Sequence, residues 1–148
     1  MKSNQSKQLS MMVGVILILL AIQYELGMFI NLSPDLPELP AFGFSLQGIS
    51  NALHQAGLVA LVHAILGSFL ALMSLWILIF SLRSKTRSVK ILGSLGFLLM
   101  IAAWAGGVLF TLSGFQDDHY SLAMASDFIL AFSFYFLELY FLKPGSSN

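Results

Sequence analysis

The sequence predicts an all-α integral membrane protein, a bundle of four transmembrane helices with both termini in the cytoplasm. Of its 148 residues, 57% are hydrophobic and only 9% are charged, whereas a soluble domain carries about 25% charged residues. The apolar residues gather in four long segments, each with the roughly 20 residues needed to cross a hydrocarbon core of about 30 Å. The basic residues fall outside these segments in a pattern that places all of them on one face of a membrane.

The four predicted spans cover residues 10–32, 51–82, 91–113 and 119–142 and form a single domain. The first span is longer than the apolar region of about 7–15 residues in a signal peptide, so we expect it to be retained. It ends at a stretch that contains Pro34, Pro37 and Pro40, which prevent the helix from continuing. The second span is long enough to tilt or to project beyond the bilayer.

The charged residues separate by face when the chain is threaded through these spans. The bases on one face are Lys2, Lys7, Arg83, Lys85, Arg87, Lys90 and Lys143. The positive-inside rule assigns this face to the cytoplasm. Asp35, Glu38, Asp117 and Asp118 fall on the opposite face. An error in any span would scatter the bases over both faces, so the pattern predicts a multi-pass protein of the cell membrane with both termini inside.

Ionisable residues within the spans form the first candidate site. Glu25, His63 and Asp127 lie at similar depths in three spans, given a rise of about 1.5 Å per residue. Because an ionisable residue costs at least about 2.5–3.5 kcal/mol in a membrane, this polar cluster predicts a proton relay or the polar end of a quinone pocket. The alternative is that both acids are protonated or paired with His63 and hold the helices together. Glu138 lies near Lys143, and we expect it to snorkel or to form an ion pair at the cytoplasmic surface.

Histidines at the outer ends of two spans form the second candidate site. His54 and His119 start spans that run in the same direction, so the two imidazoles could bind a heme iron axially. His63 with Met124 is a deeper alternative pair. The competing interpretation is that His54 and His119 are ordinary interfacial residues. No HExxH or comparable spacing accompanies the acids beside His119, and the chain has no cysteine, so we predict no site for a single metal ion.

Two motifs resemble the heme A synthase family, whose halves are four-helix bundles with histidines at the outer ends of their second and fourth helices. Residues 23–27, Gln-Tyr-Glu-Leu-Gly, look like that family's Q-x-x-x-G helix end. Residues 106–111 followed by His119 are similar to its glycine-to-histidine interval. The resemblance implies that His54 and His119 are heme ligands. The family's acid ahead of the second-helix histidine and its outer-loop cysteine pair are missing, so synthase catalysis is not implied. Residues 25–28, 63–67 and 120–125 resemble small uncharacterised prokaryotic four-helix membrane proteins. This resemblance implies no activity.

Small residues recur at helical spacing on two spans, as is typical of helix–helix interfaces in membranes. These stripes are Ala56, Ala60, His63, Gly67 and Ser74, and Gly96, Met100, Ala103 and Gly107. They predict self-association or a partner within a membrane complex, in addition to contact with the lipid bilayer. The basic segment 83–90 has no interleaved aromatic residues, so we expect no nucleic-acid partner.

The sequence thus predicts a small membrane protein with either of two roles, and it leaves open whether the protein is an enzyme. The first role is a heme-binding, b-type cytochrome-like component or a quinone-linked redox component, with heme b as the cofactor. The alternative is a non-catalytic subunit or assembly factor of a larger complex, in which Glu25, His63 and Asp127 only hold helices together.

Overall fold

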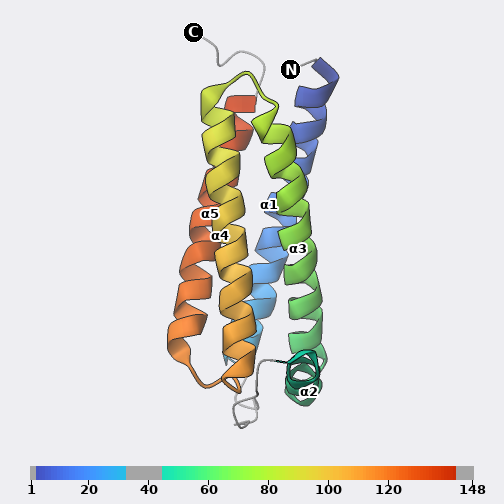
Figure 1. Cartoon of the computed structure of the whole chain (residues 1–148), viewed down its shortest axis with the longest axis vertical. Helices are drawn as coiled ribbons and strands as arrows, with labels where there is room; N and C mark the ends of the chain where they lie inside the picture. The colour runs from blue at the N-terminus through green and yellow to red at the C-terminus, as the bar shows by residue number, and fades with distance from the viewer. Residues whose placement is uncertain (1–2, 33–44, 143–148) are drawn as a thin grey trace.

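The regular secondary structure of the protein is helical throughout residues 3–32 and 45–142, the ranges that the computed structural model describes (Figure 1). The helices are α1 (Ser3–Leu32), α2 (Leu46–Ala56), α3 (Leu58–Leu82), α4 (Arg87–Leu112) and α5 (Asp118–Leu142).

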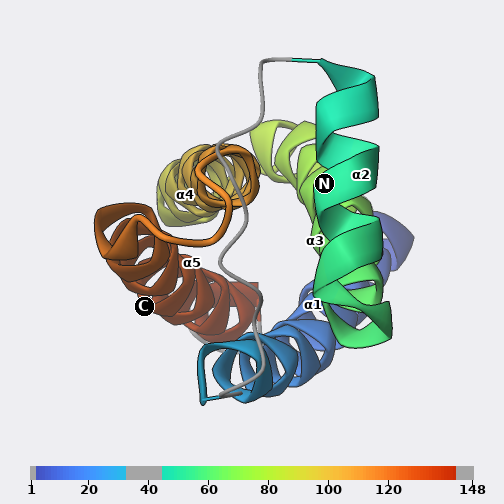
Figure 2. The same ribbon diagram turned by 90° about the horizontal axis from the view of Figure 1, so that it is seen from below.

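The long helices α1, α3, α4 and α5 stand side by side as a bundle. Both α1 and α4 pack against α3 and α5, so the helices form a ring when seen along the bundle axis (Figure 2). Each of these helices is long and apolar enough to cross a membrane. The predicted all-α bundle with four candidate spans is therefore confirmed, while its orientation in a membrane stays a prediction.

The prediction of one continuous helix over residues 51–82 is wrong, because the chain breaks at Gly57. Gly57 has φ 91° and ψ 180°, a conformation that is essentially restricted to glycine. Before this break, α2 starts at Ser45, whose Oγ accepts a hydrogen bond of 2.9 Å from the Gly48 N–H. As a result, α2 lies across one end of the bundle instead of extending α3 (Figure 2).

The described bases gather at one end of the bundle, and the acids of the turn between α4 and α5 lie at the other end. The basic end contains the start of α1 with Lys7, the turn between α3 and α4 with Arg83 and Lys85, and the end of α5 (Figure 1). The opposite end, here called the α2 end, contains Asp117 and Asp118 between α4 and α5. Lys2, Asp35, Glu38 and Lys143 lie outside the described residues.

The apolar core lies between the four long helices. It contains Leu9, Val13, Ile16, Leu17, Leu20, Leu70, Ile77, Val89, Met100, Ala131, Tyr135 and Leu142. On the outside, large apolar side chains such as Ile18, Leu72 and Phe136 are more than half exposed. A soluble monomer rarely exposes so much apolar surface, so this exterior needs lipid or protein to cover it.

Candidate functional site

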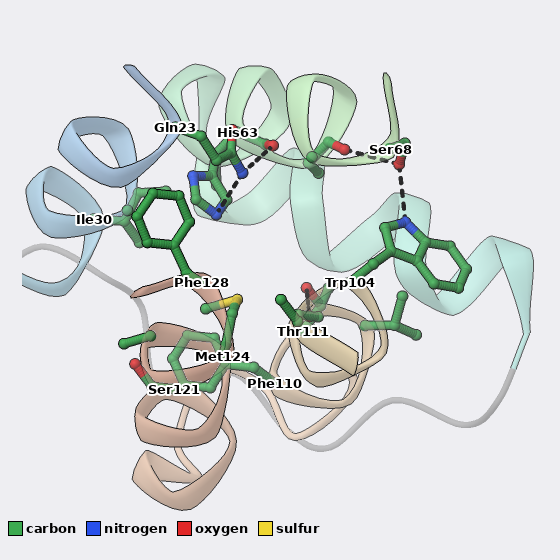
Figure 3. A pocket seen from close by; sticks show the side chains of 18 of the residues that line it. Gln23, Ile30, His63, Ser68, Trp104, Phe110, Thr111, Ser121, Met124 and Phe128 are labelled. Atoms are coloured by element: carbon green, nitrogen blue, oxygen red, sulfur yellow. Dashed lines mark hydrogen bonds between the residues drawn. The ribbon is translucent and has the colours of Figure 1, made fainter. Parts of the chain in front are cut away.

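A cavity of about 340 Å³ lies inside the bundle toward the α2 end, lined by residues of all five helices (Figure 3). This volume is near the lower limit of about 300–1,000 Å³ for small-molecule pockets. Glycine and alanine residues face the cavity from all four long helices. These residues are Gly27, Ala60, Ala64, Gly67, Ala103, Gly107 and Ala125.

Apolar side chains line the α2 end of the cavity. Leu46, Ile49 and Leu53 line it from one face of α2. Phe115 lines it from the turn between α4 and α5, where this residue has φ 63° and its ring meets Phe110 edge to face at 5.5 Å between centroids. A positive φ is uncommon for a bulky residue, and here it turns an aromatic ring onto the cavity wall.

The polar part of the cavity is a pair formed by Gln23 of α1 and His63 of α3. Gln23 Nε2 lies 3.0 Å from the His63 carbonyl oxygen and 3.1 Å from His63 Nε2. Since the carbonyl can only accept, the amide nitrogen must face it, and the amide then donates to Nε2 as well. A His63 Nε2 that accepts leaves the ring proton on Nδ1.

Two atoms of this pair have no hydrogen-bond partner among the described residues. They are Gln23 Oε1 and His63 Nδ1, and both are buried. The pair therefore has one unused acceptor and one unused donor, on two residues that line the cavity (Figure 3). Leaving a buried polar group unpaired costs about 1–3 kcal/mol, so both atoms favour a polar ligand group between the helices.

Two other pairs of polar side chains around the cavity bond to each other. Trp104 Nε1 donates to Ser68 Oγ at 3.2 Å, which joins α4 to α3. Asn31 Nδ2 donates to Ser121 Oγ at 3.2 Å, which joins α1 to α5. Most of the remaining lining is apolar, including Phe128, which stacks on Tyr24 at 5.5 Å between ring centroids (Figure 3).

The structure brings only one of the predicted heme-ligand pairs to a common cavity. His63 and Met124 both line it, from α3 and α5 (Figure 3). His54 and His119 are exposed, and neither is among the lining residues. His54 lies on α2, whereas His119 lies in a surface depression beside Asp117. Among the described residues, no three His, Asp or Glu side chains come together as a metal site.

The predicted polar cluster of Glu25, His63 and Asp127 is arranged differently in the structure. Gln23, not Glu25, pairs with His63. Two residues along a helix turn the side chain by about 200°, so Glu25 is exposed on the outside of α1. Asp127 is half-buried, and neither acid lines the cavity.

Comparisons with known proteins found no matching family model, no similar curated protein and no similar solved structure. The resemblance to heme A synthases therefore stays a prediction, and function has to be argued from the cavity.

A second group of buried polar side chains lies nearer the basic end and corrects a prediction. Glu138 was expected to snorkel to the surface, but it is 0% exposed and lies 2.5 Å from Ser81 Oγ. Gly93 of α4 makes room for both, because a Cβ atom there would lie 2.5 Å from Ser81 Oγ and 3.0 Å from Glu138 Oε1. The expected partner Lys143 lies outside the described residues.

Proposed function

We propose that the protein is a quinone-linked component of a membrane, which binds the ring of a quinone in the cavity between its helices. The observation that carries the proposal is the pair of unpartnered buried atoms on Gln23 and His63. A protonated His63 Nδ1 can donate to a quinone carbonyl, and Gln23 Oε1 can accept from a quinol hydroxyl. The pair can thus bind one ring oxygen in either oxidation state.

The cavity also suits the rest of such a ligand. Apolar and aromatic side chains line most of it, as is usual for sites that bind a flat apolar ring through a few polar groups. In a quinone-linked component, electrons pass between the quinone and a partner, which fits a role within a membrane complex or a homo-oligomer.

The proposal includes the membrane and the orientation of the chain in it. Four long apolar helices with exposed apolar side chains support a multi-pass protein of the cell membrane. The bases at the basic end support an orientation with this end and both termini in the cytoplasm. In this orientation the cavity lies in the outer half of the membrane.

The experiment is a binding titration with a short-chain ubiquinone or menadione, followed through the fluorescence of Trp104. Trp104 lines the cavity, and the only other tryptophan is the exposed Trp76. A Trp76→Phe background therefore leaves Trp104 as the only tryptophan that is observed. We expect saturable quenching that Ala103→Phe abolishes, because Ala103 lines the cavity.

Ala102→Phe is the matched control, because this neighbouring alanine is exposed and is not among the lining residues. The quinone should quench the fluorescence of this variant as strongly as that of the background protein. Equal quenching in the two phenylalanine variants, or none in the background protein, would contradict quinone binding in the cavity.

A b-type heme is the second candidate, because His63 and Met124 line the same cavity. It is tested by the oxidised and dithionite-reduced visible spectrum of protein purified after expression with adequate heme supply. A Soret band with sharp α and β bands that His63→Ala removes would favour heme over quinone. Loss of the bands in His54→Ala and His119→Ala would instead favour the pair implied by the heme A synthase resemblance. A flat spectrum would leave the quinone proposal in place.

A further inference from the structure

Glu138 is a fully buried acid without a described basic partner. It is 0% exposed between α3, α4 and α5, and its Oε2 has no hydrogen-bond partner among the described residues. Tyr135, one turn earlier on the same face of α5, is also 0% exposed and has an unpartnered hydroxyl. Burying an unpaired carboxylate is very costly, and such groups take up a proton instead.

The hydrogen bonds of Ser81 indicate which group holds that proton. Ser81 Oγ lies 2.7 Å from the Ile77 carbonyl oxygen and 2.5 Å from Glu138 Oε1. A serine hydroxyl has a single proton to donate, and a carbonyl oxygen has none. If Ser81 donates to Ile77, the bond between Ser81 and Glu138 needs a proton from the carboxyl group.

The described groups that face Glu138 include no basic side chain that could take this proton. Tyr135 is the titratable neighbour on its own helix, α3 presents Ser81, and α4 presents Gly93. The described bases near this end are exposed on α1, α4 and the turn between α3 and α4. They are Lys7, Arg83, Lys85, Arg87 and Lys90.

We infer that Glu138, with Ser81 and Tyr135, forms a proton-binding site on the basic side of the cavity, and that Glu138 is a neutral acid in the resting protein. The site belongs to the same face of α3 as His63, because His63, Ser74 and Ser81 recur at spacings close to whole helical turns. Leu70 and Met100 lie in the core and also line the cavity.

The proton on Glu138 has a role in the proposed function, because a quinone needs protons when it is reduced. Reduction of a quinone to a quinol takes up two protons and two electrons, and the electrons would come from a redox protein that partners this chain in the membrane. A protonated acid between the basic end and the cavity can supply one of the two protons, and the carboxylate that remains would be reprotonated from the basic end. The supply of protons to a quinone rests on the proposed function. The protonation of Glu138 does not, so the two can fail separately.

The test is an infrared spectrum of the purified full chain in lipid nanodiscs at neutral pH. Carboxyl groups in water are ionised at this pH, so a carbonyl stretching band of a protonated acid that shifts in D₂O reports a buried neutral acid. We expect a component of this band in the wild type that disappears in Glu138→Gln. Glu25→Gln, the same change at an acid on the outer face of α1, should retain this component.

A second variant covers the case in which Glu138→Gln fails to fold, which circular dichroism would reveal. Ser81→Ala keeps the acid but removes its partner, so the band should remain and move to a different frequency. Absence of the band in the wild type, or an unchanged band in folded Glu138→Gln, would overturn the inference. Loss of the wild-type band when sodium replaces potassium would also overturn it, because the site would then bind a sodium ion.

Discussion

At the scale of single residues, the two unpartnered atoms of Gln23 and His63 favour a polar ligand group beside them. A buried polar atom costs about 1–3 kcal/mol while it stays unpaired. A quinol hydroxyl that accepts from His63 Nδ1 and donates to Gln23 Oε1 recovers this energy, and the burial of its ring adds to the affinity. The affinity of the cavity should therefore depend strongly on a few polar atoms and only weakly on the exact apolar lining.

His63→Leu should weaken the binding of a short-chain quinone about 3–10-fold, because one hydrogen bond contributes about 0.5–1.5 kcal/mol. The Gln23 amide keeps its bond to the backbone carbonyl of residue 63, so the helix contact should survive. The measurement is the fluorescence titration of Trp104. His54→Leu is the control, since His54 is exposed and does not line the cavity. Equal affinities in the two leucine variants would show that His63 does not contact the ligand.

The sequence could identify some residues of the site but not their partners. His63 and Met124 were predicted as site residues, and both line the cavity. Gln23 was noted only as part of the motif at residues 23–27 and not as a site residue, because an uncharged amide carries no insertion penalty that draws attention to it. The available signal was the spacing of four residues between Gln23 and Gly27, which places this amide on the same helix face as a small residue. The burial of Glu138 depends on Ser81, 57 positions away in the chain, and spacing within one helix cannot reveal such a contact.

At the scale of helices, the contact of α4 with α5 depends on a glycine that leaves room for an aromatic ring. A Cβ atom at Gly96 would lie 2.8 Å from two ring atoms of Tyr135. Tyr135 is fully buried and belongs to the core of the bundle. The ring therefore has little space into which it can move, and a larger residue on α4 must push the two helices apart.

Gly96→Ala should lower the free energy of unfolding by about 1–3 kcal/mol, the usual cost of overpacking. Thermal unfolding in detergent, followed by circular dichroism, measures the effect as a lower apparent Tm. Gly14→Ala is the matched control, because a Cβ atom there meets nothing within 4 Å. Alanine also has the higher helix propensity, so Gly14→Ala should leave the apparent Tm unchanged or raise it slightly. Similar losses in both variants would show that tight packing at Gly96 is not the cause.

The long helices could be predicted from the sequence, but the break between α2 and α3 could not be predicted from hydrophobicity. Apolar residues continue on both sides of Gly57, so residues 51–82 read as one span. What ends α2 is the backbone conformation of this glycine, and what starts it is the cap at Ser45. A serine cap and a single glycine occur inside many apolar segments, and only the packing of α2 onto α3 and α4 selects the break here.

At the scale of the whole molecule, the bundle separates two kinds of polar site. The cavity with Gln23 and His63 lies toward the α2 end, while the buried acid Glu138 lies toward the basic end. If the proposed orientation is correct, the acid is close to the cytoplasm and the cavity is close to the outside. Protons would then reach the cavity from the cytoplasmic side, so the direction of proton uptake depends on how the bundle is inserted.

The orientation can be tested with single cysteines, because the chain has none of its own. Thr86 at the basic end and Gln116 at the α2 end are both exposed and uncharged, so Thr86→Cys and Gln116→Cys leave every topogenic charge in place. An impermeant maleimide added to intact cells should label Gln116→Cys at once and Thr86→Cys only after the membrane is permeabilised. Labelling of Thr86→Cys in intact cells would place the basic end outside, against the positive-inside rule. Glu138 would then take up protons from the outer side, and the cavity would lie near the cytoplasm.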